Sequence, residues 1–390
     1  MSRFNGKHVS DAICFCIDPL NLARQKLTLT AKAKFLVPVT STSIPLQLGF
    51  VPLVDAAPLI MAAELGLFAK YDVSVRLNRE AGWATIRDKI IYKELDAAHA
   101  PAVLVLAASC GIASIATPCL TGFIFNLHGN AITLSESLWK HGVRDGRTLQ
   151  AEVEKKNRDY VFAIPSPFAS HNFLLRSWLL QHRIIPDKDV RIVVVPPPQM
   201  LPNLHAGNID GYCVGEPWNS MAVLEKQGWI AACSSELTPG HPEKALLVRK
   251  SFAEEKASQH LALIAALIEA CQFCQKLENR ERVVETLAQR KYLDVPIQTI
   301  RASLGGHFDM GHGRIEKMPD FHVFSGPLAN EPTLERGRWV CGEMKAHGLF
   351  SDPDSAARLP IKDFFRADIY HEASLLTSPK PKLTSCLISI

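Results

Sequence analysis

The sequence carries little net charge and no long run of basic residues. Its 390 residues include 43 Lys and Arg against 39 Asp and Glu, a formal charge of +4. Proteins that bind nucleic acid usually gather basic residues into a patch or stripe, so direct nucleic-acid binding is not expected. With 47% hydrophobic and 21% charged residues, the composition also excludes coiled-coil, collagen-like and intrinsically disordered classes.

The chain also lacks the patterns of common enzyme and metal sites. No phosphate-binding loop, Ser-His-Asp set or dinucleotide fingerprint is present. Cys271 and Cys274 form one C-x-x-C without a second pair, and His307 and His312 lie in a glycine-rich segment, 305–313, that is expected to be a flexible loop. We therefore predict no catalytic residue, metal or cofactor, and expect the cysteines to be buried small hydrophobic residues in a reducing compartment.

No export signal is recognised near the N-terminus. A secretory signal needs a basic start, an apolar stretch of about 7–15 residues and a small-residue cleavage site, and charged residues from Asp11 to Lys34 interrupt each candidate stretch. A cytoplasmic protein is therefore expected. The uncharged stretch from Ala97 to Ser135 is long enough to span a membrane. Proline, glycine and histidine punctuate it, which favours buried elements of a sheet and no membrane span.

Short apolar strands alternate with helices in two stretches of the chain, which is typical of an α/β fold with parallel strands. After about residue 250 the pattern becomes mainly helical. The expected strands cover 46–51, 73–77, 160–164, 191–195 and 211–214, and the expected helices 56–68, 83–92, 170–180, 200–206, 259–277, 281–289, 296–304 and 332–347.

Six segments occur in a distinctive order: LGFVPLVDAAPL (48–59), REAGWATIRDK (79–89), HGNAITLS (128–135), PPPQMLPNLHAGNIDGYCVGEPWN (196–219), GHPEKAL (240–246) and LANEPTLERGRW (328–339). Together they resemble the nitrate/nitrite/bicarbonate-binding proteins of ABC importers. The GEPWN motif is the most specific of them. The resemblance implies a type II periplasmic-binding-protein fold, in which the ligand lies in a cleft between two lobes, and no enzymatic activity.

Domain boundaries follow from this resemblance and from the charged stretch between the two α/β regions. We expect residues 1–45 to be an N-terminal extension with the composition of a partly disordered segment. Residues 46–142 and 241–373 would form a discontinuous first lobe and residues 143–240 the second lobe. Residues 374–390 would form a loose tail.

Within this family, the sequence is most similar to the cytosolic NasS-type nitrate/nitrite sensors. The similarity rests on the segments REAGWATIRDK and GNAITLS and on the lack of a recognised export signal. That resemblance implies an ANTAR-domain RNA-binding antiterminator as a partner that ligand binding releases. The alternative is the substrate-binding component of an ABC importer, whose partner would be a permease. A third possibility is an enzyme, because thiamin-pyrimidine synthases share a similar fold, and bicarbonate is an alternative ligand.

A nitrate site must supply hydrogen-bond donors and positive potential, and must keep carboxylates from facing the anion. By resemblance, Lys244 contacts the anion. His171 opens a helix, whose N-terminus favours anions, and the family has a binding histidine there. Trp83 offers an indole N–H that only donates, and the amide of Asn130 can donate to an oxygen.

Further candidates follow the buried strand at 211–214, at the end where α/β proteins usually bind ligands. Gly215 would let the backbone approach the ligand closely. Glu216 cannot hold nitrate, so it is expected to orient Lys244 or to bridge the lobes. By resemblance, Leu53 and Pro197 line the cleft as apolar walls.

Overall fold

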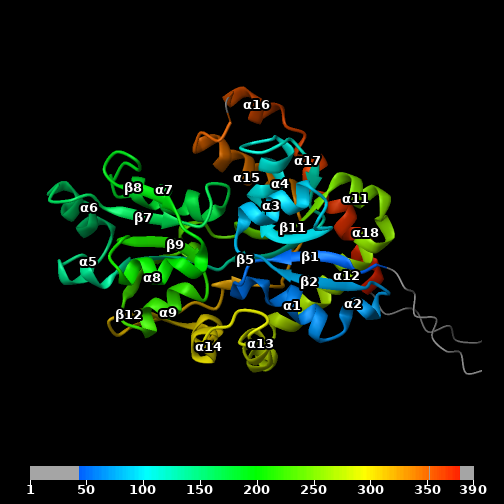
Figure 1. The fold of residues 1–390 in the computed structure, drawn as a ribbon, viewed down its shortest axis with the longest axis horizontal. Coiled ribbons are helices and arrows are strands. Elements are labelled where there is room, and N and C mark those ends of the chain that lie inside the picture. The colour runs from blue at the N-terminus through cyan, green and yellow to red at the C-terminus, as the bar shows by residue number, and fades with distance from the viewer. Residues whose placement is uncertain (1–43, 351, 378–390) are drawn as a thin grey trace, which may run out of the picture. The chain divides into compact units, whose positions relative to one another are not determined.

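The structure is a computed structural model that describes residues 44–350 and 352–377. Within them the predicted two-lobed α/β arrangement is present, because the strands form one seven-stranded and one five-stranded sheet. In Figure 1 the strands of the larger sheet, including β1, β2 and β11, lie to the right of β7, β8 and β9 of the smaller one. Residues 1–43 of the expected extension lie outside the described residues.

The first sheet combines strands from the start of the described chain with a strand from its middle. The order is β14-β5-β11-β3-β1-β2, with β4 also paired to β11. Here β1 is parallel to β2 and β3, whereas β11 is antiparallel to β3. The bounds are β1 Leu46–Phe50, β2 Val75–Arg79, β3 Ala97–Pro101, β4 Cys119–Leu120, β5 Ile124–His128, β11 Pro242–Arg249 and β14 His322–Val323.

The second sheet has the order β10-β6-β9-β7-β8. Its strands β7, β8 and β9 are parallel to their neighbours in that group, and β6 is antiparallel to both β9 and β10. The bounds are β6 Asn130–Ser135, β7 Val161–Ile164, β8 Arg191–Val194, β9 Gly211–Gly215 and β10 Gly228–Cys233.

The predicted helices are present with shifted bounds. The helix expected over 56–68 is divided in two, because Gly66 adopts a left-handed φ of +68° between its halves. The helices up to the second sheet's end are α1 Ala57–Glu64, α2 Leu67–Lys70, α3 Trp83–Ile91, α4 Val103–Ser109, α5 Glu136–Lys140, α6 Gly146–Glu154, α7 Ser170–Gln181, α8 Met200–His205, α9 Trp218–Leu224 and α10 Ser234–Leu237. The later ones are α11 Lys250–Glu255, α12 Ala257–Gln275, α13 Arg280–Leu287, α14 Ile297–Leu304, α15 Leu334–Ala346, α16 Pro353–Arg358, α17 Ile361–Phe364 and α18 Ala367–Thr377; short 3₁₀ turns are η1 Val54–Ala56, η2 Pro197–Gln199 and η3 Leu277–Asn279.

The chain passes from the first sheet to the second at Gly129. This residue has a φ of +98°, and a Cβ there would lie 2.5 Å from the ring of His322, so a side chain would be both strained and obstructed. The crossing differs from the predicted boundary at 142/143, because β6 pairs with β9 and β10 rather than with the first sheet. The chain returns between β10 and β11.

The glycine-rich segment expected to be a loop is instead a β-hairpin. Strands β12 (His307–Gly311) and β13 (Arg314–Lys317) pair antiparallel, and the turn residues His312 and Gly313 both have positive φ, as a tight hairpin requires. Phe308 and Met310 are buried against Ile230 and other residues of the second lobe. Part of the range 241–373 therefore packs on the second lobe, not only on the first.

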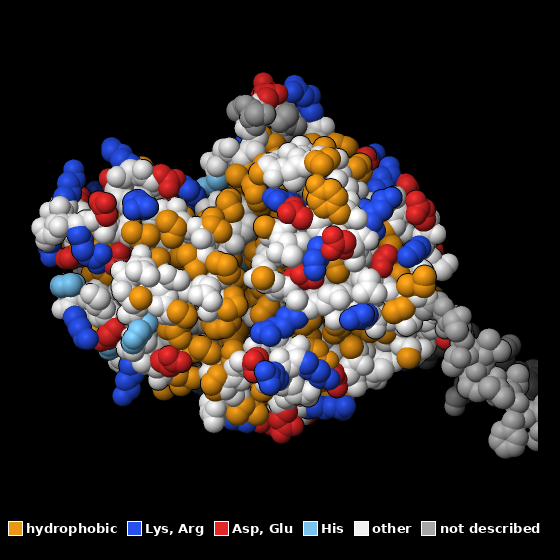
Figure 2. Space-filling view, viewed as in Figure 1, with side chains coloured by type: hydrophobic (Ala, Val, Ile, Leu, Met, Phe, Trp, Pro, Cys, Tyr) orange, Lys and Arg blue, Asp and Glu red, His pale blue; other side chains and the backbone are white. Residues whose placement is uncertain are grey.

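The long uncharged stretch forms β3, α4, β4, β5 and β6, as the buried-sheet interpretation predicted. Among the described residues, only α12 has the length and composition to cross a bilayer. In this fold 61% of the apolar stretch of α12 is buried. The helix packs between α1 and α18 as a core helix of the first lobe. On the face shown in Figure 2, Lys and Arg side chains are scattered rather than gathered into one patch.

The predicted loose tail begins within a helix. Helix α18 extends to Thr377 and packs on α12. Ala373 is completely buried, and the ring of Tyr370 stacks 6.5 Å from that of Phe123. The expectation was therefore wrong for residues 374–377, because they continue as the last turn of a helix that is anchored by Tyr370 and Ala373. Residues 378–390 lie outside the described part of the chain.

Candidate functional site

Lys244 is completely buried in β11, between β3 and β5. The pairing register shifts between Pro242 and Lys244, so Glu243 is an extra residue at a bulge. The Nζ atom of Lys244 lies 2.7 Å from Oδ2 of Asp55 and 2.6 Å from Oε1 of Glu243. The lysine is therefore an internal ion-pair partner and not a solvated surface residue.

The two carboxylates keep this lysine charged. Burial alone would lower the pKa of Lys244, but Asp55 and Glu243 raise it overall. Burial raises the pKa of Asp55, with Lys244 opposing it. The pKa of Glu243 is well below its usual value because Lys244 and His171 outweigh its burial. A buried ammonium requires such counter-charges, so two carboxylates lie beside the group that is expected to meet the anion.

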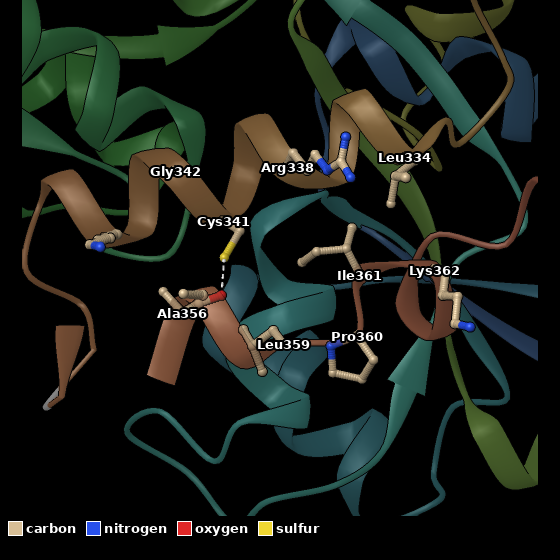
Figure 3. A pocket seen from close by; sticks show the side chains of 11 residues that line it. Leu334, Arg338, Cys341, Gly342, Ala356, Leu359, Pro360, Ile361 and Lys362 are labelled. Carbon is tan, nitrogen blue, oxygen red and sulfur yellow. Dashed lines mark hydrogen bonds between the residues drawn. The ribbon is translucent and has the colours of Figure 1, made fainter. Parts of the chain in front are cut away.

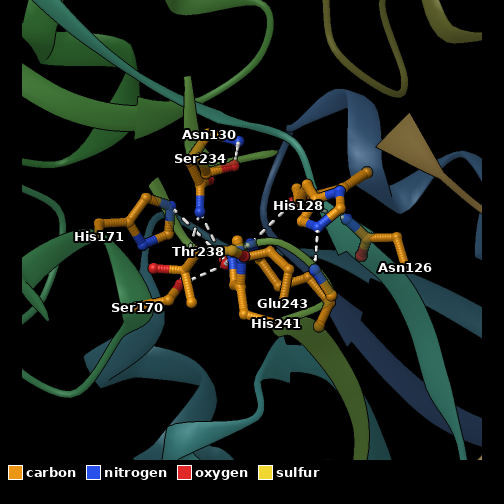
Figure 4. Close-up of polar contacts among 12 residues, drawn as sticks. Asn126, His128, Asn130, Ser170, His171, Ser234, Thr238, His241 and Glu243 are labelled. Carbon is orange, nitrogen blue, oxygen red and sulfur yellow. Dashed lines mark hydrogen bonds and ion pairs between the residues drawn. The ribbon is translucent and has the colours of Figure 1, made fainter. Parts of the chain in front are cut away.

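Glu243 connects the two lobes (Figure 4). Its Oε2 atom accepts hydrogen bonds from Nδ2 of Asn130, at 2.7 Å, and from the hydroxyl of Ser170. Nε2 of His241 lies 3.4 Å from Oε2, and Nε2 of His171 lies 3.7 Å from Oε1. Asn130, Ser170 and His171 belong to the second lobe and Glu243 to the first, so the cluster lies at the junction between the sheets.

Several buried polar groups around this cluster have no hydrogen-bond partner among the described residues. They include Nε1 of Trp83, both ring nitrogens of His171 and of His99, and Oδ1 of Asn130. The ring of Trp83 lies 5.4 Å from Nζ of Lys244. Burial lowers the pKa of His171 to about 4, so its ring is neutral near pH 7 and has one N–H to donate. An unpaired buried donor costs about 1–3 kcal/mol, so these groups favour an accepting ligand.

Gly215 and Leu53 adjoin the same cluster. Gly215 ends β9 and pairs with Asn130 of β6. A Cβ at Gly215 would lie 3.4 Å from Oδ1 of Asn130, 3.6 Å from Oδ2 of Asp55 and 3.6 Å from Leu53. The structure thus brings all five predicted ligand residues, Trp83, Asn130, His171, Gly215 and Lys244, to one place, with Leu53 as an apolar neighbour.

Glu216 does not contact Lys244, so the predicted orienting role was wrong. Its Oε2 accepts from the hydroxyl of Ser303 at 2.7 Å and from the backbone N–H of Ser220 at 3.2 Å. Its backbone oxygen accepts from the N–H of Val54 at 2.8 Å, which joins the second lobe to the first. Pro197 is buried at the start of η2, and none of these polar contacts includes it.

Sequence reasoning missed Asp55, Glu243 and Ser170 as members of the site. The signals were present: Asp55 is a lone charge within the apolar segment 51–60, and Glu243 precedes the candidate lysine directly. Ser170 precedes the candidate His171 at the start of α7. What the sequence could not supply was the bulge in β11 that brings adjacent charges together.

Two further predictions concern metal ligands and the cysteines Cys271 and Cys274, which lie outside this cluster. Among residues 44–350 and 352–377, no group of three or more His, Cys, Asp or Glu has metal-binding geometry. Cys271 and Cys274 are buried in the core of the first lobe, as predicted, and Sγ of Cys271 donates to the carbonyl oxygen of Phe125.

A separate pocket of about 480 Å³ lies among α15, α16 and α17 (Figure 3). Apolar side chains such as Leu359 and Ile361 line it together with the exposed cations Arg338, Lys345 and Lys362. No residue predicted for the ligand site lines it.

The chain matches the NMT1-like family over residues 40–288. It is 35% identical over 334 residues to the nitrate import ATP-binding protein NrtC of Synechocystis, covering 85% of this chain and 50% of NrtC. It is 36% identical over 310 residues to the bicarbonate transport ATP-binding protein CmpC of Synechococcus elongatus, covering 78% of this chain and 45% of CmpC. The chain thus spans about half the length of these curated relatives.

Among solved structures, the periplasmic nitrate-binding protein NrtA from Synechocystis superposes with a TM-score of 0.80. The two sequences are 29% identical, and the match covers 85% of this chain and 88% of NrtA. The predicted periplasmic-binding-protein fold is therefore confirmed.

Proposed function

The chain belongs to the NMT1-like family, and from that premise we propose that it binds nitrate or nitrite between its lobes as the substrate-binding component of an ABC importer. The observation that carries the proposal is the set of buried, unpartnered donors on Trp83 and His171 beside the fully buried Lys244. Similarity to the nitrate-binding NrtA and the nitrate-import protein NrtC supports this choice over the sensor.

The donors fit an anion that accepts hydrogen bonds and donates none. Nitrate and nitrite offer only acceptor oxygens. The indole N–H of Trp83 and one ring N–H of His171 are free to meet them, and Lys244 keeps a third N–H beyond those directed at Asp55 and Glu243. Burial strengthens each such contact, because the local dielectric is low.

Bicarbonate is a second candidate because unpartnered acceptors also surround the cluster. Oδ1 of Asn130 and Oδ1 of Asp55 are buried without a hydrogen-bond donor among the described residues, whereas Oδ2 of Asp55 meets Lys244. Bicarbonate can donate a proton to such an oxygen, whereas nitrate cannot. Similarity to CmpC agrees with this alternative.

Titration calorimetry of the whole chain with nitrate, nitrite and bicarbonate tests the proposal. We expect saturable one-to-one binding of nitrate or nitrite, with bicarbonate weaker. If only bicarbonate binds, bicarbonate and not nitrate is the ligand of this site. If none of the three anions binds, the proposed anion site is refuted.

The cytosolic sensor, its ANTAR-domain partner and the cytoplasmic location stay predictions. Co-purification with and without nitrate separates the two roles. A sensor would release a soluble RNA-binding partner when nitrate is added, whereas an importer component would associate with a membrane permease.

A further inference from the structure

A second cavity, of about 350 Å³, lies apart from the Lys244 cluster. Its walls are formed by the end of α12, the start of α13 and the end of α14. The β12–β13 hairpin and the segment between β13 and β14 complete them. This volume is within the range of small-molecule sites. The apolar part of the lining is formed by Leu277, Leu304, Phe308, Met318 and Phe321.

Arg280 brings a positive charge to this cavity without a counter-charge. Its Nη1 donates to the carbonyl oxygen of Leu304 at 3.1 Å, and its Nε is buried without a partner. Within residues 44–350 and 352–377, no ion pair includes Arg280. Burial lowers its pKa, yet a guanidinium remains charged at any physiological pH. An unpaired, partly buried cation is costly, so it favours an anionic partner.

His322 supplies a second donor in the same cavity. It is only 3% exposed, lines the cavity, and neither ring nitrogen has a hydrogen-bond partner among the described residues. Its ring stacks on Phe324, with centroids 5.5 Å apart, which fixes its plane. Burial, together with the nearby Arg280, lowers its pKa to about 3, so the ring is neutral and has one N–H to donate.

We propose that this cavity binds a small organic carboxylate. The carboxylate would accept hydrogen bonds from Arg280 and His322, and its apolar body would pack on Phe308 and Phe321, whose rings lie 4.2 Å apart. A single carboxylate fits better than a multiply charged phosphate, because Arg280 is the one partly buried cation in the lining, and the exposed Lys317 and Asp320 carry opposite charges.

The walls of the cavity contact the connection between the lobes. The ring of His322 occupies the space beside Gly129, where the chain crosses between the sheets. The carbonyl oxygen of Asp320 is 2.9 Å from Nδ1 of His128, and Ser303 donates to Glu216. A ligand held here would touch residues that support the crossing, which distinguishes this cavity from a surface groove.

Calorimetry of the whole chain with 3-phenylpropionate, against its neutral amide 3-phenylpropionamide, tests the proposal. We expect one-to-one binding of the acid and at least tenfold weaker binding of the amide. This comparison uses the unaltered chain, so it does not depend on a variant folding. Equal affinities, or no binding of the acid, would overturn the proposal.

A matched pair of variants then locates the site. Arg280→Gln should weaken binding of the acid at least tenfold, whereas Arg282→Gln, an exposed arginine on the same helix, should leave it unchanged. Equal affinity in Arg280→Gln and the unaltered chain would also overturn the proposal. Because nitrate is absent from these titrations, their outcome is independent of whether the interlobe cluster binds nitrate.

Discussion

Nζ of Lys244 lies 2.6 Å from Oε1 of Glu243, the residue that directly precedes it in β11. Consecutive side chains in a regular strand point to opposite faces, and this contact exists because the register shifts between Pro242 and Lys244. The irregularity fixes the ammonium group between Glu243 and Asp55 in a fully buried place. One N–H of the lysine then remains for a ligand.

Trp83→Phe should weaken nitrate binding at least tenfold, since a hydrogen bond to a charged acceptor contributes about 1.5–3 kcal/mol. Nε1 of Trp83 has no partner among the described residues, so the free energy of unfolding should change little. Trp229→Phe is the matched control, because that indole N–H is also buried and unpartnered but lies in the core of the second lobe. Calorimetry of both variants checks this; equal affinities would remove Trp83 from the site.

Gly215→Ala should weaken nitrate binding at least tenfold without unfolding the protein. The added methyl group would meet its nearest neighbours, Asn130, Asp55 and Leu53, at 3.4–3.6 Å, which is ordinary contact. It would therefore fit, but in the space where the anion is expected. Gly342→Ala, with open space around it, is the control. A Gly215→Ala protein with normal melting temperature and normal affinity would contradict the proposed position of the ligand.

Nitrate affinity should rise as the pH falls. Asp55 faces Lys244, Glu243, His171 and His99, and burial raises its pKa. An anion beside Asp55 raises the pKa of this carboxyl further, so nitrate binding is coupled to the uptake of a proton. Nitrate binding therefore becomes tighter as the pH falls toward the pKa of Asp55. Calorimetry in buffers of different ionisation enthalpy, between about pH 8 and pH 6, measures the uptake. Binding without proton uptake, at an affinity independent of pH, would contradict this role of Asp55.

Stability should fall in mild acid. Burial, then the charge of Arg366, lowers the pKa of His260 to about 4 from 6.5. Below pH 6.5 the unfolded chain therefore binds a proton that the folded chain does not. The contribution of neutral His260 to the free energy of unfolding is therefore complete above pH 6.5. It decreases toward pH 4 by up to about 1.4 kcal/mol per pH unit. Thermal unfolding across this range checks it: His260→Leu should reduce the slope, and an unchanged slope would be the contrary result.

The sequence predicted most of the fold, because its apolar strands and its helical segments are local patterns. Strand β1 and helix α7 lie nearly where the pattern put them. The sequence did not predict the hairpin at 307–317, because its strands are short and flanked by glycines. Packing of Phe308 on the second lobe stabilises it, and local preference does not. The crossing at Gly129 likewise depends on the pairing of β6, which is a tertiary contact.

The predicted donors of the site lie together, but the charges that hold Lys244 were not foreseen. Asp55 and Lys244 are far apart in the sequence, and only the packing of η1 beside β11 makes their side chains meet. Of the two roles given to Glu216, orienting Lys244 was wrong, whereas its contacts with Val54 and Ser303 agree with the other, a bridge between the lobes. The partner Ser303 lies on α14, beyond any local motif.

The central claim is that Lys244 binds the anion, and titration of the Lys244→Ala variant with nitrate tests it most directly. Lys250→Ala, an exposed lysine just after β11, is the control. We expect the control to bind like the unaltered chain and Lys244→Ala, confirmed to be folded by circular dichroism, to bind at least tenfold more weakly, about 1.4 kcal/mol. Equal nitrate affinity in all three proteins would contradict the account.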